Sequence, residues 1–439
     1  MYKRLSFLMV LTLPLSANAA GFAVKESSAA LQGTSFASAT SGTNVENLFY
    51  NPAASAFVKD TQIYTSASFI TANASVKNIS ASDTALLGNF AQSQSGSPTT
   101  SDYIEDSFVP SFALATPINN EFSFGLAVNV PFGIALNYSE NWAGRYYNID
   151  TELETINIVP TLTYAPNKKV AFSAGPQIQY AHVRFYNAID QFNIYSLNSL
   201  SPPSLNIDDG FADISGDSWG LGWTVGFMWV PEKATRIGFA YKSLVAHDFE
   251  GDAEFSNISP GLAGIFTDTG VGAKANFPAS YHLGVSHDVT DRLTLMGDVI
   301  HTEWSSFYEI RIDYDSALSD SVSTKNFDDS TSYAIGAEYK YNDDLTLRTG
   351  FMYDDSPTGD VYRSPRIPDS ERYWASLGAG YKFTESFMLN AAYSHIWMND
   401  AAVNLTGNSA TSENVSSGNL SADYEKNIHI FSLSARFSF

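Results

Sequence analysis

Apolar and polar residues alternate with a period of two at the C-terminal end of the chain. Between positions 431 and 439 the odd positions are apolar and the even positions carry serine or arginine; the odd set is Phe431, Leu433, Ala435, Phe437 and Phe439. This period gives a β-strand one apolar face and one polar face. A strand of a soluble β-sandwich shows the same alternation, so this segment alone leaves both classes open.

The same alternation recurs along the chain, for instance in segments 332–341 and 373–383. There, tyrosine, leucine, isoleucine and alanine alternate with glycine, serine and charged residues, with a tryptophan at position 374. Repeated strands of this kind are typical of a membrane barrel, which needs one face for lipid and one for the lumen.

Tight turns and long polar connections also alternate. The tight turns contain Asn, Asp, Pro, Ser or Thr and lie at 118–120, 166–169, 231–233, 290–292, 341–344 and 384–386. The long connections lie near 79–106, 138–152, 187–216, 251–275, 315–330, 355–370 and 398–424. This pattern predicts an all-β transmembrane antiparallel barrel of about 14 strands over residues 61–439, with both ends of the barrel sequence on the periplasmic side.

The first 19 residues have the pattern of a secretory signal peptide. Lys3 and Arg4 precede a short apolar run, and Ala17 to Ala19 form an A-x-A cleavage site. The apolar run is shorter than the ~20 residues that a membrane-spanning helix needs. We therefore expect an exported chain whose mature form begins at Ala20.

The composition fits a membrane barrel and argues against some partners. Aromatic residues make up 14% of the chain, charged residues only 16%, and cysteine is absent, so no disulfide is available. The net charge of -22 argues against nucleic acid as a partner, because such surfaces are basic.

Residues 20–60 are the part of the mature chain that does not show the sequence pattern of a strand. A barrel of about 14 strands has a lumen too wide for its own wall side chains to fill. We expect this segment to be a plug inside the lumen, with Pro52 fixing a compact turn that Phe49 and Tyr50 anchor. A disordered N-terminal linker is the alternative.

The sequence shows few of the motifs that mark an enzyme. Its seven histidines are scattered, and neither a zinc-protease pair nor a nucleophile elbow is present. We predict no catalytic residues, no metal and no cofactor. An outer-membrane lipase or protease stays the competing class, which hydrolysis of ester substrates by the purified protein would reveal.

Several motifs, in a shared order, resemble the FadL-type long-chain fatty acid transporters of bacterial outer membranes. They are Ala20-Gly21-Phe22, Asn51-Pro52-Ala53, Leu153-Glu154-Thr155, Trp219-Gly220-Leu221-Gly222-Trp223, Trp304-Ser305-Ser306-Phe307, Arg348-Thr349-Gly350, Asp354-Asp355-Ser356-Pro357 and Ile367-Pro368-Asp369. The terminal Phe439 also resembles the end signal of outer-membrane barrels, which the barrel-assembly machinery reads.

The resemblance implies a monomer in the outer membrane, surrounded by lipid and lipopolysaccharide, that takes up long-chain fatty acids without an energy source. It implies that residues 20–60 form a hatch, with Gly21, Phe22 and the Asn51-Pro52-Ala53 turn among its motif residues. Related proteins take up aromatic hydrocarbons, so a different hydrophobic cargo is the main alternative.

The resemblance also implies a lateral exit at a kink in the third strand, here expected between Glu121 and Leu136. Gly133 falls at the position of the kink, beside Pro131 and Phe132. Local chemistry agrees, because proline cannot donate a ladder hydrogen bond and glycine often marks a bulge. A plain edge bulge is the alternative. We expect the turn at Asn51 to Ala53 to move and uncover this opening.

For the ligand headgroup, Arg311 matches a ligand-contacting basic residue of the family. The family's second basic residue aligns with Asn187, and Arg184 is the nearby candidate to replace it. Ordinary salt bridges in the lumen are the alternative role for both arginines.

Overall fold

The structure is a computed structural model that describes residues 21–84, 93–200, 202 and 207–439. The predicted signal peptide, residues 1–19, and Ala20 lie outside the described residues.

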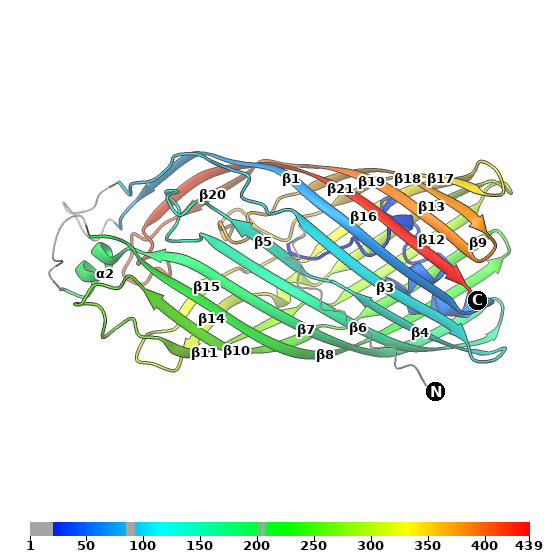
Figure 1. Cartoon of the computed structure of the whole chain (residues 1–439), viewed down its shortest axis with the longest axis horizontal. Helices are drawn as coiled ribbons and strands as arrows, with labels where there is room; N and C mark the ends of the chain where they lie inside the picture. The colour runs from blue at the N-terminus through cyan, green and yellow to red at the C-terminus, as the bar shows by residue number, and fades with distance from the viewer. Residues whose placement is uncertain (1–20, 85–92, 201, 203–206) are drawn as a thin grey trace, which may run out of the picture.

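The strands form a closed antiparallel barrel of 14 wall strands, which confirms the predicted fold class (Figure 1). Closure is made by the first and last strands, because β1 pairs with β21 along nearly their whole length. The strands are β1 (Gln62–Ser82), β2 (Thr100–Ser101), β3 (Ser107–Pro117), β4 (Phe122–Asn129), β5 (Gly133–Asn137), β6 (Asp150–Asn167), β7 (Val170–Ile189), β8 (Gly210–Glu232), β9 (Thr235–Lys242), β10 (Val245–Ser256), β11 (Thr269–Phe277), β12 (Ser280–Asp288), β13 (Leu293–Thr302), β14 (Glu309–Tyr314), β15 (Ser321–Thr324), β16 (Ser330–Lys340), β17 (Leu345–Asp354), β18 (Arg372–Thr384), β19 (Phe387–Met398), β20 (Ala401–Leu405) and β21 (Asn419–Ser438).

Seven wall strands consist of two consecutive segments each: β2 with β3, β4 with β5, β9 with β10, β11 with β12, β13 with β14, β15 with β16, and β19 with β20. Among the described residues, no helix is long and apolar enough to cross a membrane.

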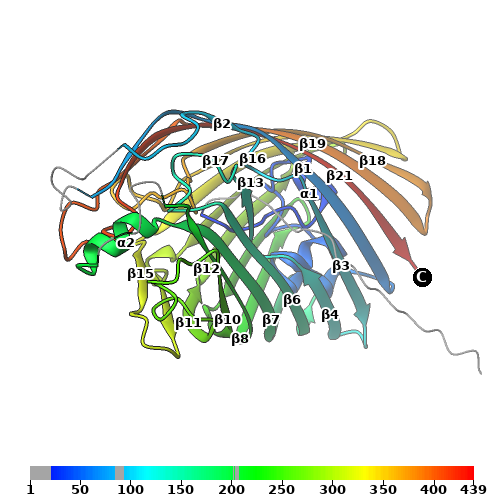
Figure 2. The same ribbon diagram turned by 60° about the vertical axis from the view of Figure 1, so that its left-hand side comes forward.

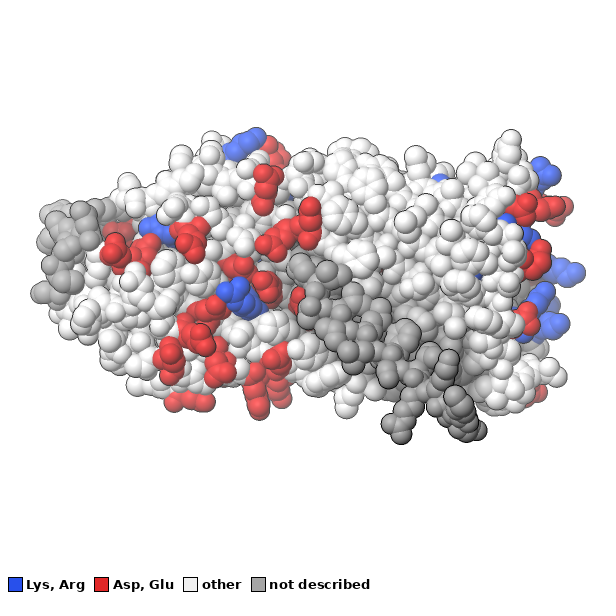
Figure 3. Space-filling model, viewed as in Figure 1, with Lys and Arg blue, Asp and Glu red and all other residues white. Residues whose placement is uncertain are grey.

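The six predicted tight turns lie together at the end of the barrel that also holds the C-terminus (Figure 1). At the other end the strands run further than the sequence suggested. The expected loop 251–275 begins and ends inside β10 and β11, and β8 has 23 residues. A membrane crossing takes only about 9–11. On the face shown in Figure 3, Asp and Glu gather over the loop-side half, so these strand extensions carry the acidic charge.

Residues 21–58, here called the N-terminal segment, lie inside the barrel (Figure 2). The segment contains three short helices: α1 (Ala29–Gln32), η1 (Val45–Phe49) and η2 (Pro52–Phe57). Two further short helices, α2 (Gln191–Leu197) and η4 (Trp304–Ser306), lie outside it.

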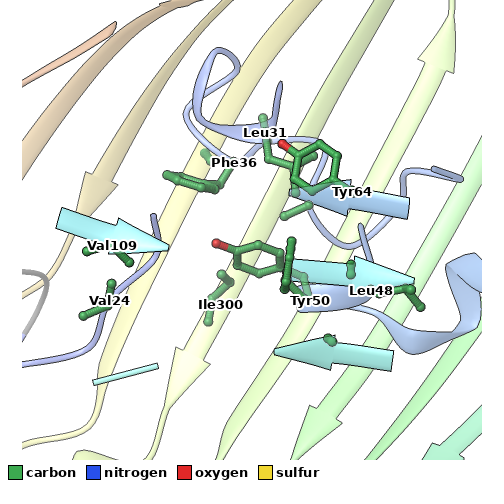
Figure 4. Packing of buried hydrophobic residues seen from close by; sticks show 14 of the residues in the cluster. Val24, Leu31, Phe36, Leu48, Tyr50, Tyr64, Val109 and Ile300 are labelled. Carbon is green, nitrogen blue, oxygen red and sulfur yellow. The ribbon is translucent and has the colours of Figure 1, made fainter. Parts of the chain in front are cut away.

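Small residues let the N-terminal segment approach the wall closely. A Cβ atom on Gly350 would lie 2.1 Å from the Thr34 backbone, and one on Gly238 would lie 2.0 Å from the Thr40 carbonyl oxygen. Larger side chains fill the space between segment and wall. One buried cluster combines Phe36, Leu48 and Tyr50 with Tyr64 and Ile300 of the wall (Figure 4). The segment is therefore packed as a core and is not a free linker.

Candidate functional site

The Asn51-Pro52-Ala53 turn begins η2 and is bound to the wall. The Asn51 side chain accepts a hydrogen bond from Ala53 N at 3.1 Å, which caps the helix, while Pro52 takes the first helical position. The same side chain donates to the Phe227 carbonyl of β8 at 3.1 Å. None of the hydrogen bonds described for this turn reaches the break in the third strand, so the expected movement of the turn stays a prediction.

The third wall strand is broken between β4 and β5. Asn129 lies opposite Asn157 of β6, and Gly133 lies opposite Glu154. The three residues 130–132 therefore face only two residues of β6, which is the one-residue excess of a β-bulge.

The break leaves a gap on its β3 side. β4 pairs with β3 as far as Val128, which lies opposite Phe112, whereas β5 has no described ladder with β3. Residues 107–111 of β3 consequently pair with β1 alone. The wall thus lacks ladder hydrogen bonds between residues 107–111 and residues 130–133, where Pro131, Phe132 and Gly133 lie.

The N-terminal segment is bonded to the β5 edge of this gap. Val24 N donates to the Pro131 carbonyl at 2.8 Å, and Gly133 N donates to the Phe22 carbonyl at 2.9 Å. These two bonds form a short bridge in which Ala23 lies opposite Phe132. Main-chain groups that a neighbouring strand would satisfy are here satisfied by the N-terminal segment.

Side chains of β3 and of the end of β4 also bond to the N-terminal segment. The Ser111 hydroxyl donates to the Ser27 carbonyl at 2.6 Å, and Asn129 donates to the Ser27 hydroxyl at 3.3 Å. Val24 and Val109 belong to one buried hydrophobic cluster (Figure 4). Residues 22–27 therefore fill the gap from the lumen side.

An apolar pocket with an empty volume of about 610 Å³ lies on the loop side of Phe22. Its walls are mainly aliphatic and aromatic and include Leu153, Val183, Phe185 and Phe249. Phe22 forms part of the floor, with edge contacts to the rings of Phe132, Phe277, Trp304 and Phe307 at centroid distances of 4.7–5.7 Å.

A second cavity, with an empty volume of about 850 Å³, lies on the turn side of Phe22. Its lining mixes apolar with polar and charged residues and is more polar than that of the apolar pocket, so we call it the polar cavity. Its lining includes Gln177, Gln179 and Lys242 together with the ion pair between Lys25 and Asp354, whose atoms are 2.8 Å apart. An apolar chain gains less by entering this cavity than by filling the apolar pocket, because the polar groups that it covers would lose water without replacement.

One arginine lines the apolar pocket. Arg366, between β17 and β18, donates from Nε to the Tyr147 carbonyl at 3.1 Å and from Nη2 to Asn187 Oδ1 at 3.0 Å. Its guanidinium also lies 4.5 Å from the centroid of the Phe185 ring. Burial lowers the pKa of Arg366 to about 10, so the group stays charged at neutral pH.

A buried lysine is bonded to the loop that carries this arginine. Lys325, between β15 and β16, is 1% exposed and donates from Nζ to the hydroxyls of Ser323 and Ser364 at 2.9 and 3.0 Å. Burial lowers the pKa of Lys325 to about 7; the charge of Arg366 lowers it further and Glu413 opposes this. In the part of the chain that the structure describes, neither cation has a carboxylate within 4.0 Å.

The two arginines expected at the headgroup are not part of the described lining of either cavity. Arg311 pairs with Glu309 at 2.8 Å and Arg184 pairs with Asp213 at 2.7 Å. Val183 and Phe185, on either side of Arg184, line the apolar pocket, and so does Ile310, which precedes Arg311. Because successive side chains of a strand point to opposite faces, both arginines point away from the pocket. Their contact with a ligand stays a prediction.

Sequence reasoning missed Arg366 and Lys325. Arg366 directly precedes the Ile367-Pro368-Asp369 motif, which was a usable signal, and its partner Asn187 is where the resemblance placed a basic residue. Lys325 lies in a polar connection with no motif to mark it.

A second break in the wall lies between β9 and β10. Residues 218–223 of β8 pair with β7 but lie in no ladder with β9 or β10. Ser243 N donates to the Trp223 carbonyl at 2.9 Å, Trp223 N donates to the Ser243 hydroxyl at 2.9 Å, and Gln177 donates to the Trp223 carbonyl at 3.1 Å. The bonds described at this break join residues of the wall itself.

Residues 21–84, 93–200, 202 and 207–439 contain no group of three or more His, Cys, Asp or Glu side chains placed to hold a metal ion.

A family model described as "Outer membrane protein transport protein (OMPP1/FadL/TodX)" matches residues 10–439. Among curated proteins, a long-chain fatty acid transport protein of Escherichia coli O6:H1 is 30% identical over 332 residues, which cover 71% of this chain and 73% of that protein. Outer membrane protein P1 of Haemophilus influenzae is 25% identical, covering 87% of this chain and 86% of that protein.

Solved structures share the fold. A Pseudomonas aeruginosa FadL homologue superposes with a TM-score of 0.85 at 24% identity, covering 96% of this chain and 100% of that one. The Pseudomonas putida toluene transporter TodX gives a TM-score of 0.68 at 19% identity, covering 93% of this chain and 98% of that one.

Proposed function

Because this chain belongs to the OMPP1/FadL/TodX family of outer membrane transport proteins, we propose that it takes up long-chain fatty acids by diffusion and releases them sideways into the membrane. The observation that carries this proposal is the double role of residues 22–27. Phe22 forms part of the apolar pocket, and the same short stretch fills the gap in the wall.

The apolar pocket suits a long hydrocarbon tail. Burial gains roughly 0.8 kcal/mol per CH₂, so a chain of ~16 carbons gains on the order of 10 kcal/mol. One charge-assisted hydrogen bond to the headgroup adds only about 1.5–3 kcal/mol. The tail therefore supplies most of the affinity, and the headgroup sets orientation.

The way out is through the gap and not along the barrel axis. The axial direction leads from Phe22 into the polar cavity, where a tail would face Lys25 and Asp354. A ligand that displaces Phe22 pulls on the Phe22 carbonyl, which holds Gly133 N, and so loosens the residues that fill the gap. The tail then passes from one apolar environment to another without crossing water.

The bulge offers a specific test. Deleting Pro131 leaves two residues opposite two of β6, which restores the register of the third strand. We expect this variant to bind oleate normally but to lose most uptake of labelled oleate in a strain without its own transporter. The double change Pro131→Thr and Gly133→Val, which supplies a ladder donor and β-branched side chains, should act in the same direction. Wild-type uptake by a correctly inserted deletion variant would rule out the lateral route.

The second candidate is uptake of monoaromatic hydrocarbons, which the mainly apolar lining of the pocket also permits. Solved relatives of the same fold carry that description. If the wild-type chain supported uptake of toluene but not of oleate, the fatty acid proposal would fail while the apolar pocket and the gap kept their roles.

A further inference from the structure

The polar cavity has more basic than acidic groups in its lining, which contains two lysines and one carboxylate, that of Asp354. Lys25 neutralises this carboxylate, because its Nζ atom donates to both oxygens at 2.8 and 2.9 Å. Lys242 has no carboxylate within 4.0 Å among the described residues, and its described hydrogen bond runs to the Phe49 carbonyl at 2.7 Å. An ammonium group has three N–H donors, so two donors of Lys242 have no described partner.

His282 is a neighbour of Lys242 on the same face of the wall. Lys242 of β9 lies opposite Ser280 of β12, and His282 follows Ser280 by two positions, so the two side chains are diagonal neighbours on the face that lines the cavity. The Tyr50 ring of the N-terminal segment lies beside both. Its centroid is 5.6 Å from Lys242 Nζ and 6.2 Å from the centroid of the His282 ring.

One ring nitrogen of His282 is buried without a described partner. His282 is 4% exposed, its Nε2 atom lies 2.9 Å from the Ser280 hydroxyl oxygen, and Nδ1 has no hydrogen bond among the described residues. When Nε2 accepts the hydroxyl proton, Nδ1 carries the ring proton and is a donor. A buried donor without an acceptor costs free energy, and an anion bound beside Lys242 would supply the acceptor.

The rest of the lining decides which kind of anion fits. Val24, Phe132 and Ile300 give the cavity apolar surface, against which a hydrated inorganic anion would lose water without replacement. Asn157 Oδ1, the other lining atom that is buried without a described partner, is an acceptor and suits a water molecule. A carboxylate with a short apolar tail matches both the donors and the apolar surface.

We propose that Lys242 and His282 form a carboxylate-binding site, and that the polar cavity takes short-chain organic acids such as butyrate. The site is separate from the apolar pocket, because neither residue lines that pocket, and it does not rest on the proposed function. A carboxylate at Lys242 competes with the Phe49 carbonyl for the ammonium group. Occupancy of the site therefore weakens one bond between the wall and the N-terminal segment.

The test titrates sodium butyrate into the purified protein labelled with ¹⁵N-histidine, at constant ionic strength. The chain has seven histidines, and the variant His282→Gln identifies the ring signals of His282. Two charge-assisted hydrogen bonds correspond to a dissociation constant on the order of 1 mM, so we expect a saturable shift of the Nδ1 signal in that range. The neutral analogue butyramide, which has the same tail, should bind at least tenfold more weakly.

Variants assign the effect to the ammonium group. Lys242→Met should weaken butyrate binding by about 10- to 100-fold, the size of one charge-assisted hydrogen bond, whereas Lys242→Arg should keep most of it. Thr302→Val, an isosteric change elsewhere in the lining of the same cavity, is the matched control and should bind butyrate like the wild type.

Three results would overturn the inference. The first is an unchanged His282 signal at roughly 100 mM butyrate, far above the expected range. The second is equal binding of butyrate and butyramide by the wild type, which needs no variant and would show that the cavity does not select an anion. The third is equal butyrate binding by the wild type and by Lys242→Met.

A carboxylate could reach the site from a second source, as the headgroup of a long-chain ligand whose tail has entered the gap, since Pro131 and Phe132 line the same cavity. Displacement of butyrate by oleate but not by oleyl alcohol would identify this source. If neither displaces butyrate, the site serves free short-chain acids. Failure of the wild type to take up oleate would overturn the proposed function and would leave the butyrate result unaffected.

Discussion

Two interruptions of the barrel wall, the β9–β10 break and the β4–β5 break, are closed by different means. At the β9–β10 break, the groups that bridge Ser243 and Trp223 belong to the wall itself. At the β4–β5 break, the bonds to Pro131 and Gly133 come from the N-terminal segment. The proposed lateral exit requires a break that opens when a separate segment moves, and of these two breaks only the β4–β5 break is closed by such a segment.

The position of the two breaks reinforces this difference. The polar cavity reaches the β9–β10 break, where Gln177 and Ser243 are among its lining residues. The β4–β5 break lies at the boundary of the two cavities, because Phe22 lines the apolar pocket while Ala23 and Val24 line the polar cavity. Only the latter break therefore lies at the end of an apolar route.

The largest expected effect comes from removing the segment that closes the β4–β5 break. Deleting residues 21–58 should leave a folded barrel, because the ladders between wall strands do not depend on that segment. We expect the outer membrane to become permeable to small polar solutes, by about tenfold or more, as in barrels with an open lumen. Solute entry into cells gives the measurement.

The matched control is Gln177→Ala, which weakens the closure of the β9–β10 break while the N-terminal segment stays in place. Permeability of this variant should stay near wild type. A deletion variant that inserts correctly and does not leak would show that the wall strands seal the lumen alone.

A reversible tether tests whether movement of the segment is needed. The chain has no cysteine, and Ala23 lies opposite Phe132 in an antiparallel bridge, a spacing that suits a disulfide. We expect Ala23→Cys with Phe132→Cys to stop most oleate uptake when oxidised, and reductant to restore it.

The control tether joins two wall strands beside the β9–β10 break. Val225 and Tyr241 are opposite each other on β8 and β9, so Val225→Cys with Tyr241→Cys should leave uptake unchanged in either redox state. Full uptake by the oxidised Ala23–Phe132 tether would mean that the gap opens without the N-terminal segment.

A smaller effect is expected when the aromatic contact alone is removed. Phe22→Ala deletes a buried ring that touches four other rings, and such changes cost about 3–5 kcal/mol in a core. The bond from Gly133 N to the Phe22 carbonyl should then open more often, so the Gly133 amide should exchange hydrogen faster. The Trp223 amide at the other break should not change, and equal acceleration at both would indicate general loosening.

The sequence predicted the barrel because its signals are local. Alternation shows each strand directly, and the six tight turns separate one strand from the next. Pro131 and Gly133 marked the break for the same reason, since both residues act on their own backbone. The confirmed resemblance placed the chain in its family through short motifs.

The contacts inside the lumen could not be predicted in this way, because they join residues far apart in the chain. Arg366 meets Tyr147 and Asn187, which are far from it in the chain, and the motif beside Arg366 does not show which residues it contacts. The Asn51-Pro52 turn was expected at the opening, yet its bonds run to β8, and Phe22 to Ser27 occupy the gap. A turn can be read from its residue types, but its position cannot.

The smallest expected effect is on the stability of the N-terminal segment against opening, which should depend on pH. Glu26 is buried between Lys25 and Ser27; one carboxyl oxygen accepts Lys25 N at 2.8 Å, and the other is buried without a described partner. Burial raises the pKa of this carboxyl from 4.5 to about 7. A raised pKa means that the folded state prefers the protonated form, so the stabilisation is complete below about pH 4.5 and is lost as the pH rises through 7.

Between pH 6 and pH 8 we therefore expect the segment to lose on the order of 1 kcal/mol of stability against opening. The exchange rate of the Val24 amide, corrected for the intrinsic effect of pH, measures this loss. The variant Glu26→Gln should remove the pH dependence, because an amide at this position does not titrate. If that variant kept the same dependence as the wild type, the effect would belong to another group.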